Sequence, residues 1–296
     1  MALLVVQNND YQAQQTVSAS QTAYECGVEL QVIQTEHDAV VQSQKILDLL
    51  YAAAETRPDG IMFEPVGTPL AQAAKIAASS GVGWVVLNRE VDYISELRRT
   101  CTSPVFTVST DHDEVGRIQG EQIGKLLPRG GAVLYVQGPS DNKAAVRRAA
   151  AMQAAKPANV EVRVLKGLWT EESAYNSVAS WLKLNVNKEA TCSLVAAQND
   201  AMAIGARRAF QEISAGAERE RWLSLPYIGC DGLPSTGQEY VHRGVLAATV
   251  VIPANAGQAV KAMVNALRSK QQPQECIYVS ASSYPQLASL APAAVK

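Results

Sequence analysis

Polar side chains recur wherever a short apolar segment of this sequence ends. Seven such segments are followed by amides, carboxylates or a guanidinium, in the stretches Gln7-Asn8-Asn9-Asp10-Tyr11, Glu64-Pro65, Asn88-Arg89-Glu90, Thr110-Asp111, Gln137 to Asn142, Gln198-Asn199-Asp200 and Asp231-Gly232. These groups donate and accept hydrogen bonds, which suits a ligand that carries hydroxyls. Each stretch taken singly is also typical of a turn or a helix N-cap. Their recurrence favours a polar binding pocket.

The elements that must position these groups alternate along the chain. Apolar segments predict strands at 3–7, 29–34, 60–64, 84–88, 105–109, 132–137, 161–165, 193–197, 227–230 and 248–252. Amphipathic patterns predict helices at 12–26, 38–55, 68–80, 111–127, 143–155, 171–186, 199–213 and 235–243. Asp111 is expected to cap one of them, with Glu114 three residues later as in a capping box.

The fold class follows from this alternation. Unbroken apolar strands such as Trp84-Val-Val-Leu87 are typical of a parallel sheet covered on both faces. The pattern restarts near Gly130-Gly131, which predicts two doubly wound α/β lobes rather than one eight-stranded barrel. Ligands of open α/β sheets bind outside the carboxyl ends of the strands, where the polar stretches lie.

Signals of catalysis are weak. The histidines, His37, His112 and His242, are not at metal-ligand spacing, and His112 is expected to be solvated in the first turn of a helix. No Gly-x-Ser-x-Gly elbow is present, and no Gly-x-Gly-x-x-Gly follows the first strand. The segment from Gly120 to Lys125 lacks one spacer residue and the Ser/Thr of a phosphate-binding loop. We therefore expect no enzyme activity, no metal and no cofactor.

Composition limits the partners. The formal net charge is -2 and basic residues form only isolated pairs, so a nucleic-acid partner is not expected. No apolar run is long enough for membrane insertion. The opening residues 1–6 lack a basic region and are too short for a signal sequence, which leaves either a removed signal or a cytoplasmic location. Five cysteines without a Cys-x-x-Cys pair are expected to be small buried side chains.

In order and spacing, several motifs resemble those of the type I periplasmic sugar-binding proteins of ABC transporters. This ribose-binding-like family shares its fold with the ligand domains of LacI-type repressors. The motifs are Asn88-Arg89-Glu90, Thr110-Asp111 with Gly116-Arg117 and Gly120, the stretch 197–206, Gly229-Cys-Asp231-Gly232 and Ala247-Ala-Thr249-Val250. The resemblance implies two lobes joined by three crossings, one formed by 1–109 and 253–279 and the other by 110–252 and 280–296. It also implies that the lobes close on a ligand by hinge bending.

The resemblance also assigns roles to individual residues. Asn9 matches the amide after the first strand, and Tyr11 and Trp169 match aromatics that stack on a sugar ring. Arg89 matches an arginine that holds two hydroxyls, and Asn199 and Asp231 match a hydroxyl-binding amide and carboxylate. We further expect the polar side chains Asn88, Asp141 and Arg147 to line the pocket.

Three positions depart from the family pattern. Asn88 stands where the family has an aspartate, Val146 where a binding arginine is expected, and Ile252 where a glutamine is expected. Arg147 replaces that arginine only if it turns by about 100° around its helix. These changes make the expected pocket less charged than a ribose site. Acidic neighbours such as Glu64 and Glu90 equally suit a ligand that carries an amine.

Two functions follow from these observations. The first is a solute-binding protein that closes two lobes on a sugar or sugar-like ligand for an ABC-type transporter, with the permease as partner. The alternative is a cytoplasmic ligand-sensing protein of the same fold that acts as a two-state switch on a signalling partner. A transcription regulator requires a helix-turn-helix before the first strand, and the first strand is expected at residue 3.

Overall fold

The chain is organised around two β-sheets. The computed structural model describes residues 1–5, 10–35, 38–67, 70–184 and 191–292. Two units, each with one sheet, comprise residues 1–110 with 254–279 and residues 111–253 with 280–296. The chain thus passes from one unit to the other after Thr110, after Pro253 and after Val279.

Unit 1 contains six parallel strands in the order β11-β5-β4-β3-β1-β2. Its strands are β1 (Ala2–Val5), β2 (Gln31–Gln34), β3 (Gly60–Phe63), β4 (Gly83–Leu87), β5 (Val105–Thr110) and β11 (Cys276–Val279). Its helices are α1 (Asp10–Cys26), α2 (Ala39–Leu50), α3 (Ala71–Ser79), α4 (Ile94–Thr100) and α12 (Ala256–Ser269).

Unit 2 contains six strands in the order β12-β10-β9-β8-β6-β7, of which only β12 is antiparallel. Its strands are β6 (Gly131–Gln137), β7 (Val160–Lys166), β8 (Leu194–Ala197), β9 (Tyr227–Asp231), β10 (Ala248–Val251) and β12 (Ser282–Tyr284). Its helices are α5 (His112–Leu126), α6 (Lys143–Ala155), α7 (Glu171–Leu182), α9 (Asp200–Ile213), α10 (Gly216–Leu223) and α11 (Glu239–His242). A π-helical turn (Pro234–Gln238) and a 3-10 turn (Leu287–Ser289) complete it.

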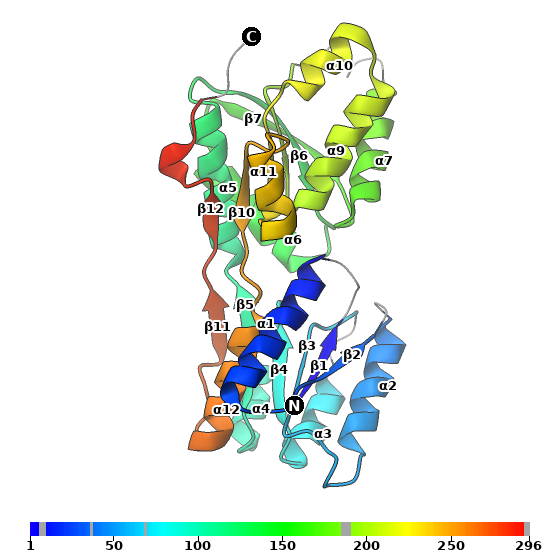
Figure 1. The fold of residues 1–296 in the computed structure, drawn as a ribbon, viewed down its shortest axis with the longest axis vertical. Coiled ribbons are helices and arrows are strands. Elements are labelled where there is room, and N and C mark those ends of the chain that lie inside the picture. Colours follow the sequence, from blue (N-terminus) through cyan, green and yellow to red (C-terminus); the bar gives the residue numbers. More distant parts are fainter. Residues whose placement is uncertain (6–9, 36–37, 68–69, 185–190, 293–296) are drawn as a thin grey trace. The chain divides into compact units, whose positions relative to one another are not determined.

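The two sheets share one topology. In each, the first strand of the unit lies between the second and the third, which is the 2-1-3-4-5 order of a doubly wound fold (Figure 1). The prediction of two doubly wound α/β lobes is confirmed. Because crossover helices return the chain to the start of each new strand, the carboxyl ends of the parallel strands lie at one edge of each sheet.

Both faces of each sheet are buried, as the unbroken apolar strands predict. Alternate residues of β1 belong to different cores: Ala2 and Leu4 pack with side chains of α2, α3 and α4, whereas Leu3 and Val5 pack with side chains of α1 and α12. In unit 2, Leu134 and Val136 of β6 pack toward α7, α9 and α10, and the residues between them pack toward α5 and α6. Helices cover the two faces of each sheet in Figure 1.

Helices α5 and α6 pack closely because small residues line their contact. A Cβ added to Gly116 would lie 2.2 Å from the carbonyl oxygen of Arg148, and one added to Gly120 would lie 2.8 Å from that of Met152. Real Cβ atoms do not approach so closely. The Gly116-Arg117 and Gly120 motif of the sequence is therefore a packing requirement, since only glycine allows the two backbones to approach this far.

The predicted strands and most predicted helices are present, with ends that differ by a few residues. Helices α4, α10 and α12 and strands β11 and β12 were not predicted. The expected helix at 235–243 is a π-helical turn followed by the single-turn α11. Asp111 caps α5 by accepting from the backbone of Asp113 and Glu114. In a full capping box the Glu114 carboxylate would accept from the backbone of Asp111. Here that carboxylate pairs with Arg117 instead.

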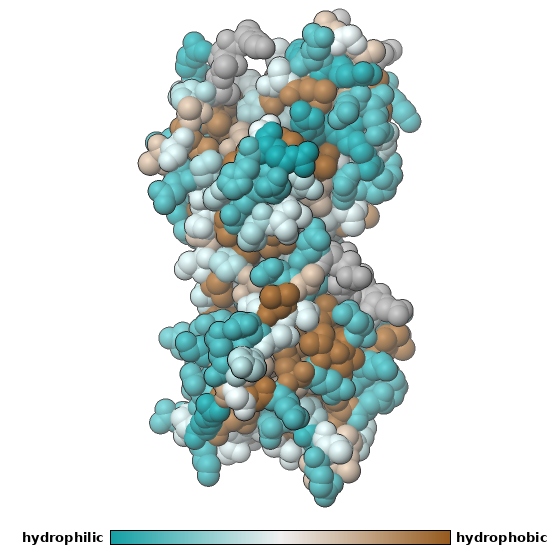
Figure 2. Space-filling view, in the orientation of Figure 1, coloured by the Kyte–Doolittle hydropathy of each residue, from teal (hydrophilic) through white to brown (hydrophobic). Residues whose placement is uncertain are grey.

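The surface is mixed in polarity. Figure 2 shows hydrophilic residues over much of the visible face, with hydrophobic residues in groups between them. None of the helices within the described ranges is both long enough and apolar enough to span a bilayer. The cysteines Cys26, Cys101, Cys192, Cys230 and Cys276 are free. Only Cys230 is fully buried, so the expectation of buried cysteines is wrong for the other four, which are partly buried.

Replacement of Gly116 by alanine tests the close packing of α5 on α6. We expect Gly116→Ala to destabilise the protein by about 1–3 kcal/mol, because the added methyl group forces the α6 backbone away. Thermal unfolding should then begin at a clearly lower temperature. Gly124→Ala is the matched control on the same helix, since its Cβ would meet only the Pro157 ring, at 3.2 Å. Equal melting temperatures for the two variants would contradict the assignment.

Candidate functional site

The carboxyl edge of the unit 1 sheet carries a connected set of amides around one carboxylate. Glu64 directly follows β3, and its Oε2 accepts hydrogen bonds from the side chains of Gln12 and Asn88, both at 3.1 Å. Asn88, which directly follows β4, accepts in turn from the side chain of Asn255 at 2.5 Å. Gln15 donates to Asn255 at 2.8 Å. Four elements of unit 1 therefore fix the position of this carboxylate.

The other predicted residues of unit 1 lie near this set in the sequence. Arg89 follows Asn88 and is half-buried, and within the described part of the chain no hydrogen bond or ion pair of its guanidinium is found. Tyr11 is half-buried in the first turn of α1. Asn9 lies outside the described residues, as does His37. The structure thus brings Asn88 and Glu64 into contact.

In unit 2, Asn199 connects two predicted residues. Its Oδ1 accepts from the backbone of Met202 and so caps α9, while its Nδ2 donates to the backbone carbonyl of Trp169 at 2.9 Å. The Trp169 ring packs against Gly138, where an added Cβ would lie 2.4 Å from the ring. The Arg148 guanidinium lies over the same ring, 5.7 Å from its centroid. The structure therefore holds Trp169 by its backbone and by contacts of its ring with Gly138 and Arg148.

Two carboxylates lie close to each other at this edge. Asp200, at the first turn of α9, is buried and accepts from the backbone of Gly232 at 2.8 Å and from the hydroxyl of Thr249 at 2.7 Å. Burial raises the pKa of Asp200 well above its usual value, and the negative charge of Asp231 raises it further. Burial also raises the pKa of Asp231, to about 7, while the positive charge of Arg148 acts in the opposite direction.

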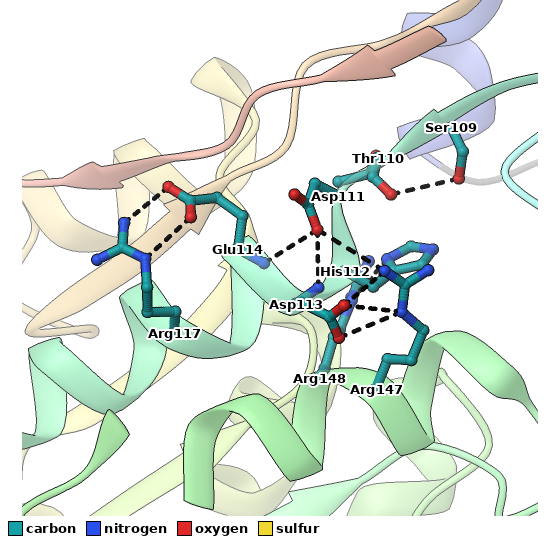
Figure 3. Close-up of polar contacts among 9 residues, drawn as sticks. All are labelled: Ser109, Thr110, Asp111, His112, Asp113, Glu114, Arg117, Arg147 and Arg148. Atoms are coloured by element: carbon teal, nitrogen blue, oxygen red, sulfur yellow. Dashed lines mark hydrogen bonds and ion pairs between the residues drawn. The ribbon is translucent and has the colours of Figure 1, made fainter. Parts of the chain in front are cut away.

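The arginine pair of α6 points in two directions. Arg147 forms an ion pair with Asp113 at 2.6 Å and approaches Asp111 to 3.9 Å (Figure 3). Arg148 is buried, donates to the backbone carbonyl of Gln198 at 3.0 Å and lies 3.4 Å from Nδ1 of His112. The structure thus places Arg148, rather than the predicted Arg147, beside Trp169. The predicted Asp141 is exposed in the turn before α6.

The sequence did not predict the burial of several polar side chains around Trp169. His112 is buried beside Arg148, so the expectation of a solvated His112 is wrong. Gln198 is fully buried and bonds to Gly138, Tyr135 and Ala145. The helical spacing of the buried residues Ala145, Arg148 and Met152 is the signal that could have identified Arg148, since it places position 148 on the inner face of α6.

Three of the predicted ligand contacts have an unusual backbone conformation. Only four non-glycine residues within the described ranges have a positive φ: Asn88 (59°), Trp169 (66°), Asp231 (96°) and Lys270 (57°). Lys270 ends α12, where a left-handed residue is a common cap. The other three were predicted as ligand contacts. Backbone strain of this kind persists where the surroundings enforce it and is concentrated at functional sites.

One further cavity lies away from the ends of the strands. A cavity of about 470 Å³ lies between α3 and α4 in unit 1 and is lined by Ala71, Lys75, Tyr93, Glu96, Leu97 and Cys101 among others. It contains none of the strand-end residues. Among the residues that the structure describes, no group of three or more His, Cys, Asp or Glu side chains is arranged to hold a metal ion. The polar groups at the carboxyl edge of each sheet are therefore the candidate functional residues of each unit.

Comparison with known proteins adds an independent line of evidence. Residues 2–271 match the family model of the periplasmic binding protein domain. A protein of Rhizobium meliloti assigned to rhizopine binding is 29% identical over 192 residues, which is 62% of this chain and 58% of that protein. The ribose import binding protein of Escherichia coli is 26% identical over 255 residues, covering 82% of this chain and 75% of that protein.

Similarity to solved structures extends over nearly the whole chain. A periplasmic solute-binding protein of an ABC transporter from Actinobacillus succinogenes, solved with bound D-allose, superposes with a TM-score of 0.79. The two chains are 19% identical, and the match covers 95% of each. At this identity the likeness establishes the fold, and it agrees with the two doubly wound sheets described above.

The raised pKa of Asp231 predicts a pH-dependent stability. The pKa of Asp231 is about 7 in the folded protein and about 3.9 in the unfolded chain. The contribution of Asp231 to the free energy of unfolding is therefore complete below about pH 3.9, and it is lost as the pH rises through about 7. An asparagine at position 231 does not titrate, so Asp231→Asn removes this loss of stability. It also removes the negative charge that helps to raise the pKa of Asp200. We therefore expect the melting temperature of the unliganded wild type to fall relative to that of Asp231→Asn between pH 5 and pH 8. Parallel curves over this range would contradict the assignment.

Proposed function

The chain belongs to the periplasmic binding protein family, and from this premise we propose that it is a solute-binding protein of an ABC-type transporter. Its ligand is a sugar or a sugar-like molecule with several hydroxyls. The relatives reported above support this proposal, since one is a ribose import protein and another carries bound D-allose. They support transport rather than the alternative of a cytoplasmic signalling switch.

The observation that carries the proposal is the strained backbone at Asn88, Trp169 and Asp231. Asn88 and Trp169 lie after strands β4 and β7, and Asp231 is the last residue of β9. All three are among the ligand contacts that the sequence predicts. The side chains of all three residues are half-buried, so each keeps some surface that a ligand can contact. A role in presenting polar and aromatic groups to a ligand accounts for all three.

The proposed contacts divide by chemistry. The guanidinium of Arg89 donates to ligand hydroxyl oxygens in a fixed fork, and Asp231 accepts from ligand hydroxyls. Tyr11 and Trp169 pack on the apolar faces of the ring. Asn199 holds the Trp169 backbone and has one amide hydrogen left for the ligand. All these contacts remain predictions, as do those of Asn9, Asn88, Asp141 and Arg147, the expected lobe limits and hinge closure.

We propose binding and not catalysis. The carboxylates of Asp200 and Asp231 form a coupled pair with raised pKa values, which on its own would suit acid–base chemistry. Asp200, however, is enclosed by Gly229 and Gly237, where an added Cβ would lie 2.2 Å and 2.1 Å from its oxygens. Such enclosure gives Asp200 a structural role, with Gly232 and Thr249 as its donors.

Substitution of Arg89 tests the proposal together with a ligand screen. We expect thermal unfolding against sugars, polyols, amino sugars and nucleosides to reveal a ligand that raises the melting temperature. Arg89→Ala should then weaken binding of that ligand by on the order of 10- to 100-fold, because hydrogen bonds to charged groups contribute about 1.5–3 kcal/mol. Calorimetric titration measures the change in dissociation constant.

Arg99→Ala is the matched control, since Arg99 is an exposed arginine of the same unit on α4. It should leave the affinity unchanged. A panel in which sugars and polyols give no shift would contradict a polyhydroxylated ligand. An Arg89→Ala protein that binds as tightly as the wild type would contradict the assigned role of Arg89.

A further inference from the structure

Glu64 is the carboxylate around which the polar edge of unit 1 is organised. It follows β3 directly and is half-buried. Its backbone carbonyl accepts from the side chain of Gln42 at 2.8 Å, and the same Gln42 accepts from the backbone of Val66 at 3.0 Å. Both the main chain and the side chain of Glu64 are therefore held from neighbouring elements, and its carboxylate keeps one orientation.

The hydrogen bonds to this carboxylate are unevenly distributed. Both amide donors, Gln12 and Asn88, point at Oε2. Within the described residues no donor reaches Oε1 of Glu64. A carboxylate oxygen accepts about two hydrogen bonds, so Oε2 is satisfied, whereas Oε1 keeps its accepting capacity with respect to every residue that the structure describes.

Asn88 orients Glu64 and is itself fixed. Its amide hydrogen goes to Glu64 and its Oδ1 accepts from Asn255, which is fully buried. Asn255 in turn accepts from the buried Gln15. The positive φ of Asn88 places its amide in this chain of bonds. Asn88 therefore acts as a positioning residue for Glu64, in addition to any contact of its own.

Among the described residues, no cation balances the charge of Glu64. In the ranges that the structure describes, no Lys, Arg or His side chain forms an ion pair with Glu64. Its donors are neutral amides. When a ligand excludes water from such a carboxylate, the loss of solvation is costly unless the ligand brings a positive charge. A hydroxyl would satisfy Oε1 without balancing the charge, whereas an ammonium group does both.

We propose that Glu64 is a specificity-determining residue that binds a protonated amine of the ligand, and that the ligand is an amino sugar or an amino polyol. This inference rests on the proposed sugar-binding function. The ammonium donates to Oε1 of Glu64, while Arg89 holds hydroxyl oxygens of the same molecule. A fully neutral sugar leaves the charge of Glu64 uncompensated and binds more weakly.

The test compares matched pairs of ligands at pH 6.5: glucose with glucosamine, galactose with galactosamine, and mannose with mannosamine. The N-acetyl derivatives serve as probes that keep the nitrogen and lose its charge. We expect at least one amino sugar to bind more tightly than both its neutral and its N-acetyl counterpart. Glu64→Gln should weaken binding of that amino sugar by on the order of tenfold or more and leave the neutral sugar nearly unchanged.

Glu64→Gln is a suitable variant because a Gln carbonyl still accepts from Gln12 and Asn88, so the network and the fold are kept. Unfolding of the unliganded variant at the wild-type temperature checks this. Glu55→Gln is the control, since Glu55 is an exposed carboxylate of the same unit. It should change no affinity.

The outcomes separate the two proposals. If neutral sugars bind as tightly as their amino counterparts, or if Glu64→Gln weakens both equally, the amine assignment is overturned and the sugar-binding function stands. If no member of any pair binds but a neutral sugar or polyol of the wider thermal panel does, the amine assignment is overturned and the sugar-binding function stands. If the wider panel gives no ligand either, both proposals fail.

Discussion

Parallel β-strands must be joined by crossover connections, and the rest of this protein depends on that constraint. Every parallel strand of a unit then ends at the same edge of its sheet. The strands can be apolar throughout because helices cover both faces. Polar residues are therefore displaced to the strand ends, where the chain turns toward the next helix. The same geometry that builds the cores also gathers the polar groups of each unit.

The two units use carboxylates at these edges in different ways. In unit 2, Asp200 is enclosed and accepts from Gly232 and Thr249, so it ties the start of α9 to β9 and β10. In unit 1, the described residues support Glu64 with neutral amides on one of its two oxygens. A saturated carboxylate stabilises the fold, whereas a half-saturated one is available to a ligand. Burial also raises the pKa of Asp231, and the positive charge of Arg148 opposes that rise.

Specific recognition requires that such groups be held before the ligand arrives, because ordering them at the moment of binding reduces affinity. The fold achieves this through buried amides. Asn255 and Gln15 fix Asn88, and Gln198 fixes the loop at Gly138 against which Trp169 packs. The positive φ values of Asn88 and Trp169 are maintained by these contacts. Family membership and strand-end chemistry therefore point to the same class of function.

The sequence by itself determined the alternation of strands and helices, and with it the two doubly wound sheets. It also determined the local caps Asp111, Asn142 and Asn199, because an N-cap depends on residues two or three positions away. Only the tertiary structure decided that Arg148 rather than Arg147 points inward, and that Glu64 meets Asn88 and indirectly Asn255. These contacts join residues far apart in the chain, and which side chain a neighbour buries or pairs depends on how the helices pack. Local pattern cannot encode that choice, since the packing surface is completed by other elements.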